Sequence, residues 1–283
     1  MALTVNTNTT SLGVQKNLNR ATDALSTSMT RLSSGLKINS AKDDAAGLQI
    51  ATRMTSQIRG QTMAIKNAND GISIAQTAEG AMQEQTNILQ RMRELAVQSR
   101  NDTNSKDDRD ALNKEFQSML TEIDRIANST QLNGKNLLDG SASSMVFQVG
   151  SNADSNNQIS IDLTRKLTSG GALSALNGKS ITGTDSATAS ATFQNAMSAI
   201  DSALQSINDV RADLGAAQNR LTSTINNLQN INENAEAARG RVQDTDFAAE
   251  TAQLTKQQTL QQASTSVLAQ ANQLPSAVLK LLQ

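Results

Sequence analysis

Apolar residues recur at steps of seven along most of this chain, a spacing that keeps one face of a helix turned toward a partner helix. Near the N-terminus Leu18, Leu25 and Leu32 form one such row, and Val14 belongs to the neighbouring row. The pattern predicts a helix over residues 6–33.

Three more helices follow from the same periodicity in the middle of the chain. One stretch keeps apolar residues in register over residues 58–96 and stops at the polar run 101–104. A shorter stripe over residues 112–126 alternates steps of four and three, which predicts a short helix antiparallel to the one before it. The longest row covers residues 193–235, and at about 1.5 Å per residue its helix should extend roughly 65 Å.

Before the longest helix the period changes from 3.6 to 2, which is typical of strands. The alternating apolar positions are Met145, Phe147, Val149, Ile159, Ile161 and Leu163. They predict a hairpin whose turn lies in residues 150–157, with room for a further short strand. Residues 173–192 are rich in Gly, Ser, Thr and Ala, and we expect an exposed surface loop there.

The two ends of the chain differ from its middle. Their apolar rows are separated by Asn, Gln, Ser and Thr, and their apolar area is too small to offset about 1–2 kcal/mol per residue of backbone ordering. An ordinary intramolecular bundle accounts for residues 50–235, whereas the ends should fold on a partner. The predicted self-assembly seams are Val14, Leu18, Leu25, Leu32, Leu254, Leu260, Val267, Leu268, Leu274 and Leu281.

The amino-acid composition further limits the classes of protein to which this chain could belong. The 283 residues include no Cys, His, Trp or Tyr and one proline, Pro275, so little interrupts helix and little supports catalysis. Lys+Arg 25 against Asp+Glu 26, without a basic block, gives no support to nucleic-acid binding. No apolar run approaches the roughly 20 residues of a membrane span. We expect no nucleic-acid partner, no membrane insertion and no enzymatic activity.

The carboxylate clusters have structural explanations. Asp43 and Asp44 follow Ser40 at the spacing of a helix N-cap with an acid in the first turn. Residues 102–110 are rich in Asp but lack the Gly and the closing Glu of a calcium loop, so Ser105 and Asp108 are interpreted as another helix start. We expect no catalytic, cofactor-binding or metal-binding residues.

A Ser/Thr-rich segment could carry O-linked sugar if it is exposed, and an unmodified loop accounts equally well for its composition. The candidate acceptors are Ser174, Ser180, Thr182, Thr184, Ser186, Thr188 and Ser190.

Four segments of the chain closely resemble the bacterial flagellin family. They are 31–47 (RLSSGLKINSAKDDAAG), 67–76 (NANDGISIAQ), 91–99 (RMRELAVQS) and 242–250 (VQDTDFAAE). The resemblance covers the whole chain in order, but the outer variable domains of long flagellins are absent, and only the hairpin and loop at about 136–192 occupy their place.

This resemblance implies a mainly α fold: a long-helix coiled-coil bundle with a small β-hairpin region and a discontinuous terminal-helix domain. Residues 1–43 would pair with residues 241–283 as the inner helical domain, and residues 44–240 would form the rod-like domain.

The resemblance also implies a function. The chain would be the subunit of the extracellular flagellar filament, a helical homo-oligomer that drives swimming. It would leave the cell through the flagellar type III export channel, with an export chaperone on its C-terminal helix. Filament cap and hook-filament junction proteins would be its other partners in assembly.

Two surfaces for host innate immune receptors carry over by residue. Arg91, Leu95 and Glu115 match the surface of flagellin that the vertebrate Toll-like receptor binds. The segment 30–51 resembles the peptide that plant leucine-rich-repeat receptor kinases detect. The residues of that plant epitope are Arg31, Leu32, Gly35, Ile38, Asn39, Ser40, Lys42, Asp43, Asp44, Gly47 and Leu48, with Asp43, Asp44 and Gly47 as expected contacts.

Three other classes remain as alternatives. A hook-filament junction protein shares the terminal helices and would assemble in few copies. A free-standing coiled-coil adaptor would have helical ends in the isolated monomer. An enzyme would depend on Asp, Glu, Lys, Ser or Thr, and nothing in the sequence positions them for catalysis.

Overall fold

The computed structural model describes residues 7–281, and the side chains of residues 7–273. The chain divides into two compact units. One contains the described parts of residues 1–58 and 233–283, and the other contains residues 59–232. The mainly α fold class predicted from the periodicity is confirmed.

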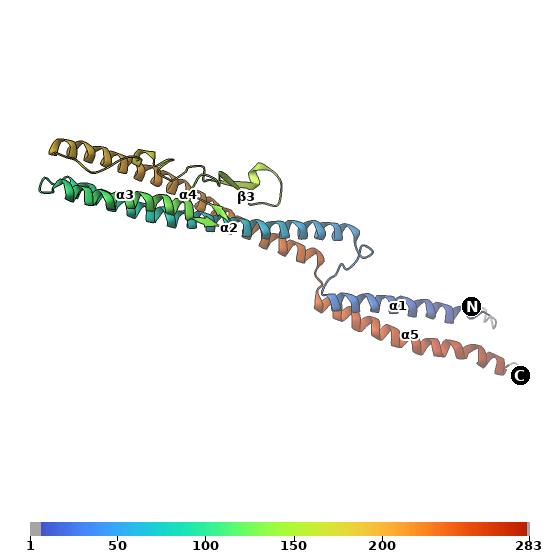
Figure 1. Cartoon of the computed structure of the whole chain (residues 1–283). Helices are drawn as coiled ribbons and strands as arrows, with labels where there is room; N and C mark the ends of the chain where they lie inside the picture. Colours follow the sequence, from blue (N-terminus) through green and yellow to red (C-terminus); the bar gives the residue numbers. More distant parts are fainter. Residues whose placement is uncertain (1–6, 282–283) are drawn as a thin grey trace. The chain divides into compact units, whose positions relative to one another are not determined.

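In the first unit, α1 (Thr9–Ser34) and α5 (Phe247–Leu281) lie side by side (Figure 1). Asn8 caps α1, since its Oδ1 accepts a hydrogen bond from the Ser11 N–H at 3.0 Å, and its Nδ2 donates to the Ala271 carbonyl of α5 at 2.8 Å. The predicted N-terminal helix is therefore confirmed, with its start at Thr9.

The contact between α1 and α5 has a small core. Among the described side chains, its buried positions are Ala21, Ser28 and Ala271, two of which are alanines. Because such side chains bury little apolar area, this pair gains much less from the hydrophobic effect than a pair with buried leucines would.

The other unit is built on three helices: residues of α2 (Ala45–Ser99), all of α3 (Lys106–Ser129) and residues of α4 (Ser186–Gln243). Helix α3 begins with a capping box in which Asp108 N donates to Ser105 Oγ and the Asp108 carboxylate accepts from Ser105 N. The predicted helix start at Ser105 is confirmed. All three helices occur where the apolar rows predict them.

Two antiparallel hairpins follow α3. The pair β1 (Gln131–Leu132) and β2 (Lys135–Asn136) turns through Asn133 and Gly134, whose φ angles are 51° and 74°. The predicted hairpin is confirmed as β3 (Ser144–Gln148) and β4 (Gln158–Asp162), with the 3-10 turn η1 (Ser155–Asn157) between them.

Beyond β4 the structure corrects one expectation. Residues 173–192 are not an exposed surface loop, because Leu173, Leu176 and Ile181 are buried in the core of this unit. The segment contains the 3-10 turn η2 (Ser174–Leu176) and then enters α4. Its few large apolar residues are enough to hold the segment against the core, because all three pack inward.

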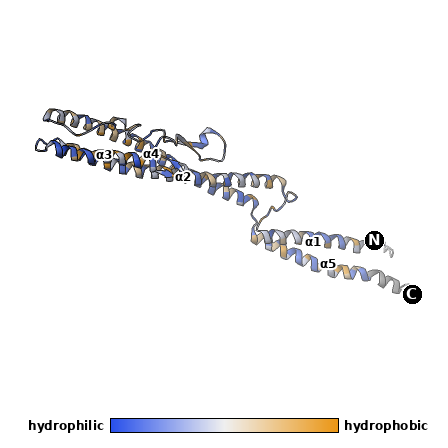
Figure 2. Ribbon diagram, in the orientation of Figure 1, coloured by the Kyte–Doolittle hydropathy of each residue, from blue (hydrophilic) through white to orange (hydrophobic). Residues whose placement is uncertain are grey.

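Hydrophilic and hydrophobic residues alternate closely along α2, α3 and α4 (Figure 2). Among the described residues, no helix combines the length and the apolar character that crossing a bilayer requires.

Candidate assembly and recognition surfaces

The predicted seam residues line α1 and α5. Val14, Leu18, Leu25, Leu32, Leu254 and Leu268 are half-buried. Leu260 and Val267 are 44% and 47% exposed, respectively, so the described residues of the chain cover them only in part. Leu274 and Leu281 lie on the α5 backbone, but their side chains are outside the described residues. The seam is thus only partly satisfied within one chain.

A short backbone joint ties the end of α1 to the start of α5. Leu36 and Asp244 form an isolated antiparallel bridge, in which the Lys37 N–H donates to the Gln243 carbonyl at 2.7 Å. Gly35 ends α1 with φ 72°, a conformation that favours glycine. Sequence reasoning missed this joint because the sequence of neither segment indicates which residues it contacts.

The segment 36–47 corrects the expected cap at Ser40. Helix α2 begins at Ala45, and the capping group is Asp44, whose Oδ1 accepts the Gly47 N–H at 2.9 Å. A Cβ on Gly47 would lie 2.6 Å from both the Asp44 carboxylate and the Ile38 side chain, so this position requires glycine. The cap therefore lies four residues beyond Ser40.

Asp43 stabilises the preceding turn instead. Its Oδ2 accepts hydrogen bonds from Ser40 N at 2.9 Å and Asn39 N at 3.1 Å, and also from the Ser40 hydroxyl. These backbone hydrogen bonds, Ser40 before Asn39, lower the pKa of Asp43 below its ordinary value. The hydrogen bonds thus favour the ionised carboxylate, which fixes the turn.

The plant-epitope residues have mixed exposure. Exposed are Asn39, Ser40, Lys42, Asp43 and Asp44; half-buried are Arg31, Leu32, Gly35 and Leu48; buried are Ile38 and Gly47. A cavity of about 210 Å³ lies at this turn, lined by Arg31, Asn39, Ser40 and Asp43 together with hydroxyl residues of α1. Arg31 also pairs with Glu250 at 3.7 Å.

The residues that match the Toll-like receptor surface are not equally accessible. The Arg91 side chain is 47% exposed and the Glu115 side chain 39%. Leu95 is fully buried in the core. Arg91 and Glu115 therefore present themselves on the surface, while Leu95 supports that surface from beneath.

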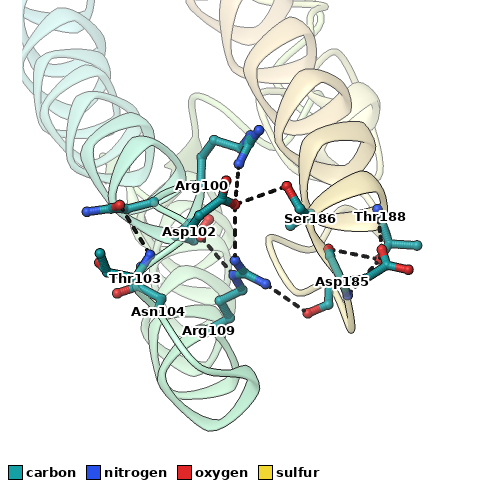
Figure 3. A network of polar contacts seen from close by, with 12 residues as sticks. Arg100, Asp102, Thr103, Asn104, Arg109, Asp185, Ser186 and Thr188 are labelled. Carbon is teal, nitrogen blue, oxygen red and sulfur yellow. Dashed lines mark hydrogen bonds and ion pairs between the residues drawn. The ribbon is translucent and has the colours of Figure 1, made fainter.

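A polar network joins the turn between α2 and α3 to the start of α4 (Figure 3). The buried Arg109 guanidinium donates from Nε to the Ser99 carbonyl at 3.1 Å and from Nη1 to the Gly183 carbonyl at 3.4 Å. Its Nη2 lies 3.8 Å from Asp102, which also accepts from Ser186 Oγ at 3.1 Å.

The network favours the ionised form of Asp102. Hydrogen bonds from Ser186 and then Arg100 lower the pKa of Asp102. Sequence reasoning missed Arg109, although a signal was present, since this residue stands seven positions before Phe116 and so falls on the apolar stripe of α3. A charged residue on such a stripe indicates a buried polar role.

The candidate glycosylation acceptors differ in accessibility. Ser174, Thr184, Ser186 and Thr188 are exposed, whereas Ser180, Thr182 and Ser190 are half-buried. Ser186 and Thr188 already bind carboxylates, at Asp102 and Asp185. Within the described part of the chain, no group of three or more carboxylates is placed to hold a metal ion.

The sequence matches two family descriptions: the bacterial flagellin N-terminal helical region over residues 5–143 and the bacterial flagellin C-terminal helical region over residues 197–282. It is 40% identical to polar flagellin C of Vibrio parahaemolyticus serotype O3:K6 and 41% identical to flagellin A of Vibrio cholerae serotype O1, each alignment covering 100% of both chains. This chain therefore belongs to the bacterial flagellin family. It is a structural subunit of the extracellular flagellar filament and not an enzyme.

The chain is a short member of this family. Its alignments with the two relatives run over 385 and 379 positions, against 283 residues here. The expected absence of outer variable domains agrees with this difference.

Among solved structures, the chain is similar to a putative flagellar hook-associated protein from Vibrio parahaemolyticus. The TM-score is 0.60 at 15% identity, over 71% of this chain and 100% of the other. That likeness shows a shared fold. The full-length identity to flagellins is what favours a filament subunit over a junction protein.

Proposed function

We propose that the chain polymerises through the α1 and α5 seams and that the free monomer is recognised by host innate immune receptors. One observation carries the first part: among the described side chains, the α1–α5 pair buries only the small residues Ala21, Ser28 and Ala271, while Leu260 and Val267 stay 44% and 47% exposed. Contacts with neighbouring copies would cover them, and this gain would drive assembly.

The domain division belongs to the same proposal. Residues 1–43 and 241–283 would form the inner helical domain, and residues 44–240 the rod-like domain. Support comes from the compact unit that contains the described parts of both terminal regions, although its limits at residues 58 and 233 differ from the proposed ones. Ordering of the inner domain would be coupled to assembly, which prevents polymerisation before export.

Electron microscopy with filament seeds tests this function. Purified monomer would be concentrated with a precipitating salt, with and without short sheared seeds. We expect long tubes to grow from the seeds. A protein that stays monomeric would favour the adaptor, and one that only decorates seed ends would favour the junction protein.

Circular dichroism tests the coupling to folding. The full-length monomer is compared with a variant that lacks residues 1–43 and 241–283. Lower helicity per residue in the full-length chain would support ends that order on assembly, and equal helicity would contradict it.

For vertebrate recognition, we propose that Arg91 and Glu115 contact the Toll-like receptor while Leu95 holds α2 and α3 beneath them. The exposure of the ionic pair supports this assignment. In the filament this face would lie between subunits, so recognition would require free monomer. Depolymerised and intact filaments should therefore differ in receptor activation at equal mass.

For plant recognition, we propose that receptor kinases read residues 30–51, with Asp43, Asp44 and Gly47 as contacts. The exposure of Asp43 and Asp44 supports the assignment. Buried Gly47 would become accessible only when the segment leaves this fold. A synthetic 30–51 peptide with Asp43→Ala should activate the receptor less than the parent peptide, and equal activation would remove Asp43 from the site.

The remaining partners are proposals from family membership. An export chaperone would cover the C-terminal helix, and cap and junction proteins would bind the growing and basal ends. Co-purification of the chain with a flagellar chaperone, lost on deletion of residues 247–283, would test the first of these. If the segment is glycosylated, exposed Ser174 and Thr184 are the favoured acceptors, which intact-mass measurement of the native protein would show.

A further inference from the structure

Methionine is the only sulfur-containing residue in this chain, because Cys is absent. Its thioether is oxidised reversibly to a sulfoxide, and accessible side chains react first. Of the nine methionines, Met29 and Met63 are the exposed ones among those whose side chains the structure describes, at 57% and 53%. Met82 and Met92 are fully buried.

Met29 extends the seam of α1. It stands four residues after Leu25 and three before Leu32, spacings that place all three on one side of a helix. Leu25 and Leu32 are half-buried, whereas the thioether beside them is largely uncovered by its own chain. The apolar seam therefore continues onto a surface that the described residues of the chain leave largely exposed.

We propose that Met29 is an oxidation site that controls polymerisation, an inference that rests on the seam function proposed above. A peroxide such as hydrogen peroxide transfers one oxygen atom to the Met29 sulfur. The O–O bond breaks, an S–O bond forms, the sulfur loses two electrons and the peroxide is reduced to water. The product carries a polar, hydrogen-bonding group in place of an apolar one.

The consequence for assembly follows from desolvation. A sulfoxide covered by a neighbouring copy would lose its hydrogen bonds to water, which opposes burial. Oxidised monomer should consequently fail to add to filaments. Once Met29 is covered in a filament, the same contact should shield it from peroxide.

Met63 provides a matched comparison, because it has nearly the same exposure but lies on α2 in the unit of residues 59–232. The variants are Met29→Leu and Met63→Leu, which keep an apolar side chain of similar volume. Each protein would be treated with hydrogen peroxide, mapped by peptide mass spectrometry, and added to sheared seeds over a concentration series.

We expect Met29 and Met63 to be oxidised before Met82 and Met92. Oxidised wild type and oxidised Met63→Leu should each need about tenfold more monomer to elongate seeds than the same protein without peroxide. Peroxide should not change the elongation of Met29→Leu relative to the same variant without peroxide. Reduction by methionine sulfoxide reductase should restore wild-type elongation.

Three results would overturn the proposal: oxidation of Met29 no faster than of Met82, unchanged elongation of oxidised wild type, or equal inhibition of Met29→Leu. Failure of the untreated chain to elongate seeds at all is a different result. It would contradict the proposed assembly function, and therefore also the control of polymerisation by Met29.

Discussion

Arg91 in α2 donates two hydrogen bonds to one carboxylate oxygen of Glu115 in α3, from Nε at 3.2 Å and from Nη2 at 3.0 Å. Its remaining nitrogen, Nη1, donates to Glu94 at 2.9 Å. The hydrogen bonds to Glu94 and then Glu115 raise the pKa of Arg91 above its ordinary value. The guanidinium is thus held in a defined direction on an exposed surface.

This geometry predicts that the proposed receptor recognition and the stability of the fold depend on different residues. Arg91→Ala removes an exposed ion pair, which contributes little to folding, so the melting temperature should stay nearly unchanged while Toll-like receptor activation falls. Leu95→Ala leaves a cavity in the core and should lower the free energy of unfolding by about 2–5 kcal/mol. Thermal unfolding and a receptor reporter assay on both variants check this. Full activation by Arg91→Ala would remove that residue from the receptor surface.

Charge on the seams should abolish assembly. Leu18 and Leu268 are half-buried on α1 and α5. Replacing either with Lys would place an ammonium group in a contact between helices, and burying an unpaired charge costs several kcal/mol. Seeded elongation should stop, while heat unfolding of the 59–232 unit stays unchanged. Normal filaments from either variant would contradict the seam assignment.

The Arg109 network should stabilise its unit. Arg109→Met keeps much of the volume but leaves the Ser99 and Gly183 carbonyls without their charged donor, so we expect a loss of about 2 kcal/mol in the free energy of unfolding. Urea unfolding measures it. Arg125→Met is the control, since the Arg125 side chain is 64% exposed in its pair with Glu122. Similar midpoints for the two variants would contradict a structural role for Arg109.

The spacing of apolar residues predicted the helices and the main hairpin, because that spacing shows which residues lie on one face of a helix or strand. Ser105 and Asp108 were identified as a cap because both partners lie within one turn. The cap at Ser40 was wrong for an instructive reason. Ser40 and Asp43 do form a hydrogen bond with each other, but the spacing of a cap also suits a separate turn. The cap of α2 is Asp44, which accepts the Gly47 N–H.

Contacts between distant segments were beyond sequence reasoning. One such contact is the bridge between Leu36 and Asp244, and another is the hydrogen bond from Arg109 to Gly183. In both cases the local sequence does not indicate which distant segment it contacts. Likewise, the scarcity of large apolar residues after Leu173 predicted exposure, whereas three buried side chains anchor that segment. The assembly seams stay a prediction, since their partner is another copy of the chain.

The capping box of α3 should give a pH-dependent contribution to stability. Hydrogen bonds from the Ser105 hydroxyl and backbone lower the pKa of Asp108 below its ordinary value of 3.8. A carboxyl whose pKa is lower in the folded state stabilises the fold above its unfolded pKa, and this contribution is lost as the pH falls through the folded pKa. The stability difference between wild type and Asp108→Asn should be largest near neutral pH and shrink below about pH 4.

Urea unfolding across pH measures this difference, with Asp107→Asn as the control because it leaves the capping box intact. A stability difference for Asp108→Asn that stays constant with pH would contradict the assignment.

Two glycines within α2 should respond in opposite ways to alanine. A Cβ on Gly71 would lie 3.1 Å from the Leu221 side chain and 3.3 Å from that of Phe147, whereas a Cβ on Gly80 would meet nothing within 4 Å. Gly80→Ala should gain up to about 1 kcal/mol from helix propensity, which would raise the melting temperature by roughly 2–4 °C. Gly71→Ala should lose more to overpacking, about 1–3 kcal/mol, than it gains from propensity. Thermal circular dichroism would measure the melting temperatures of the two variants. A lower melting temperature for Gly80→Ala than for wild type would show that α2 needs glycine there for a reason other than space.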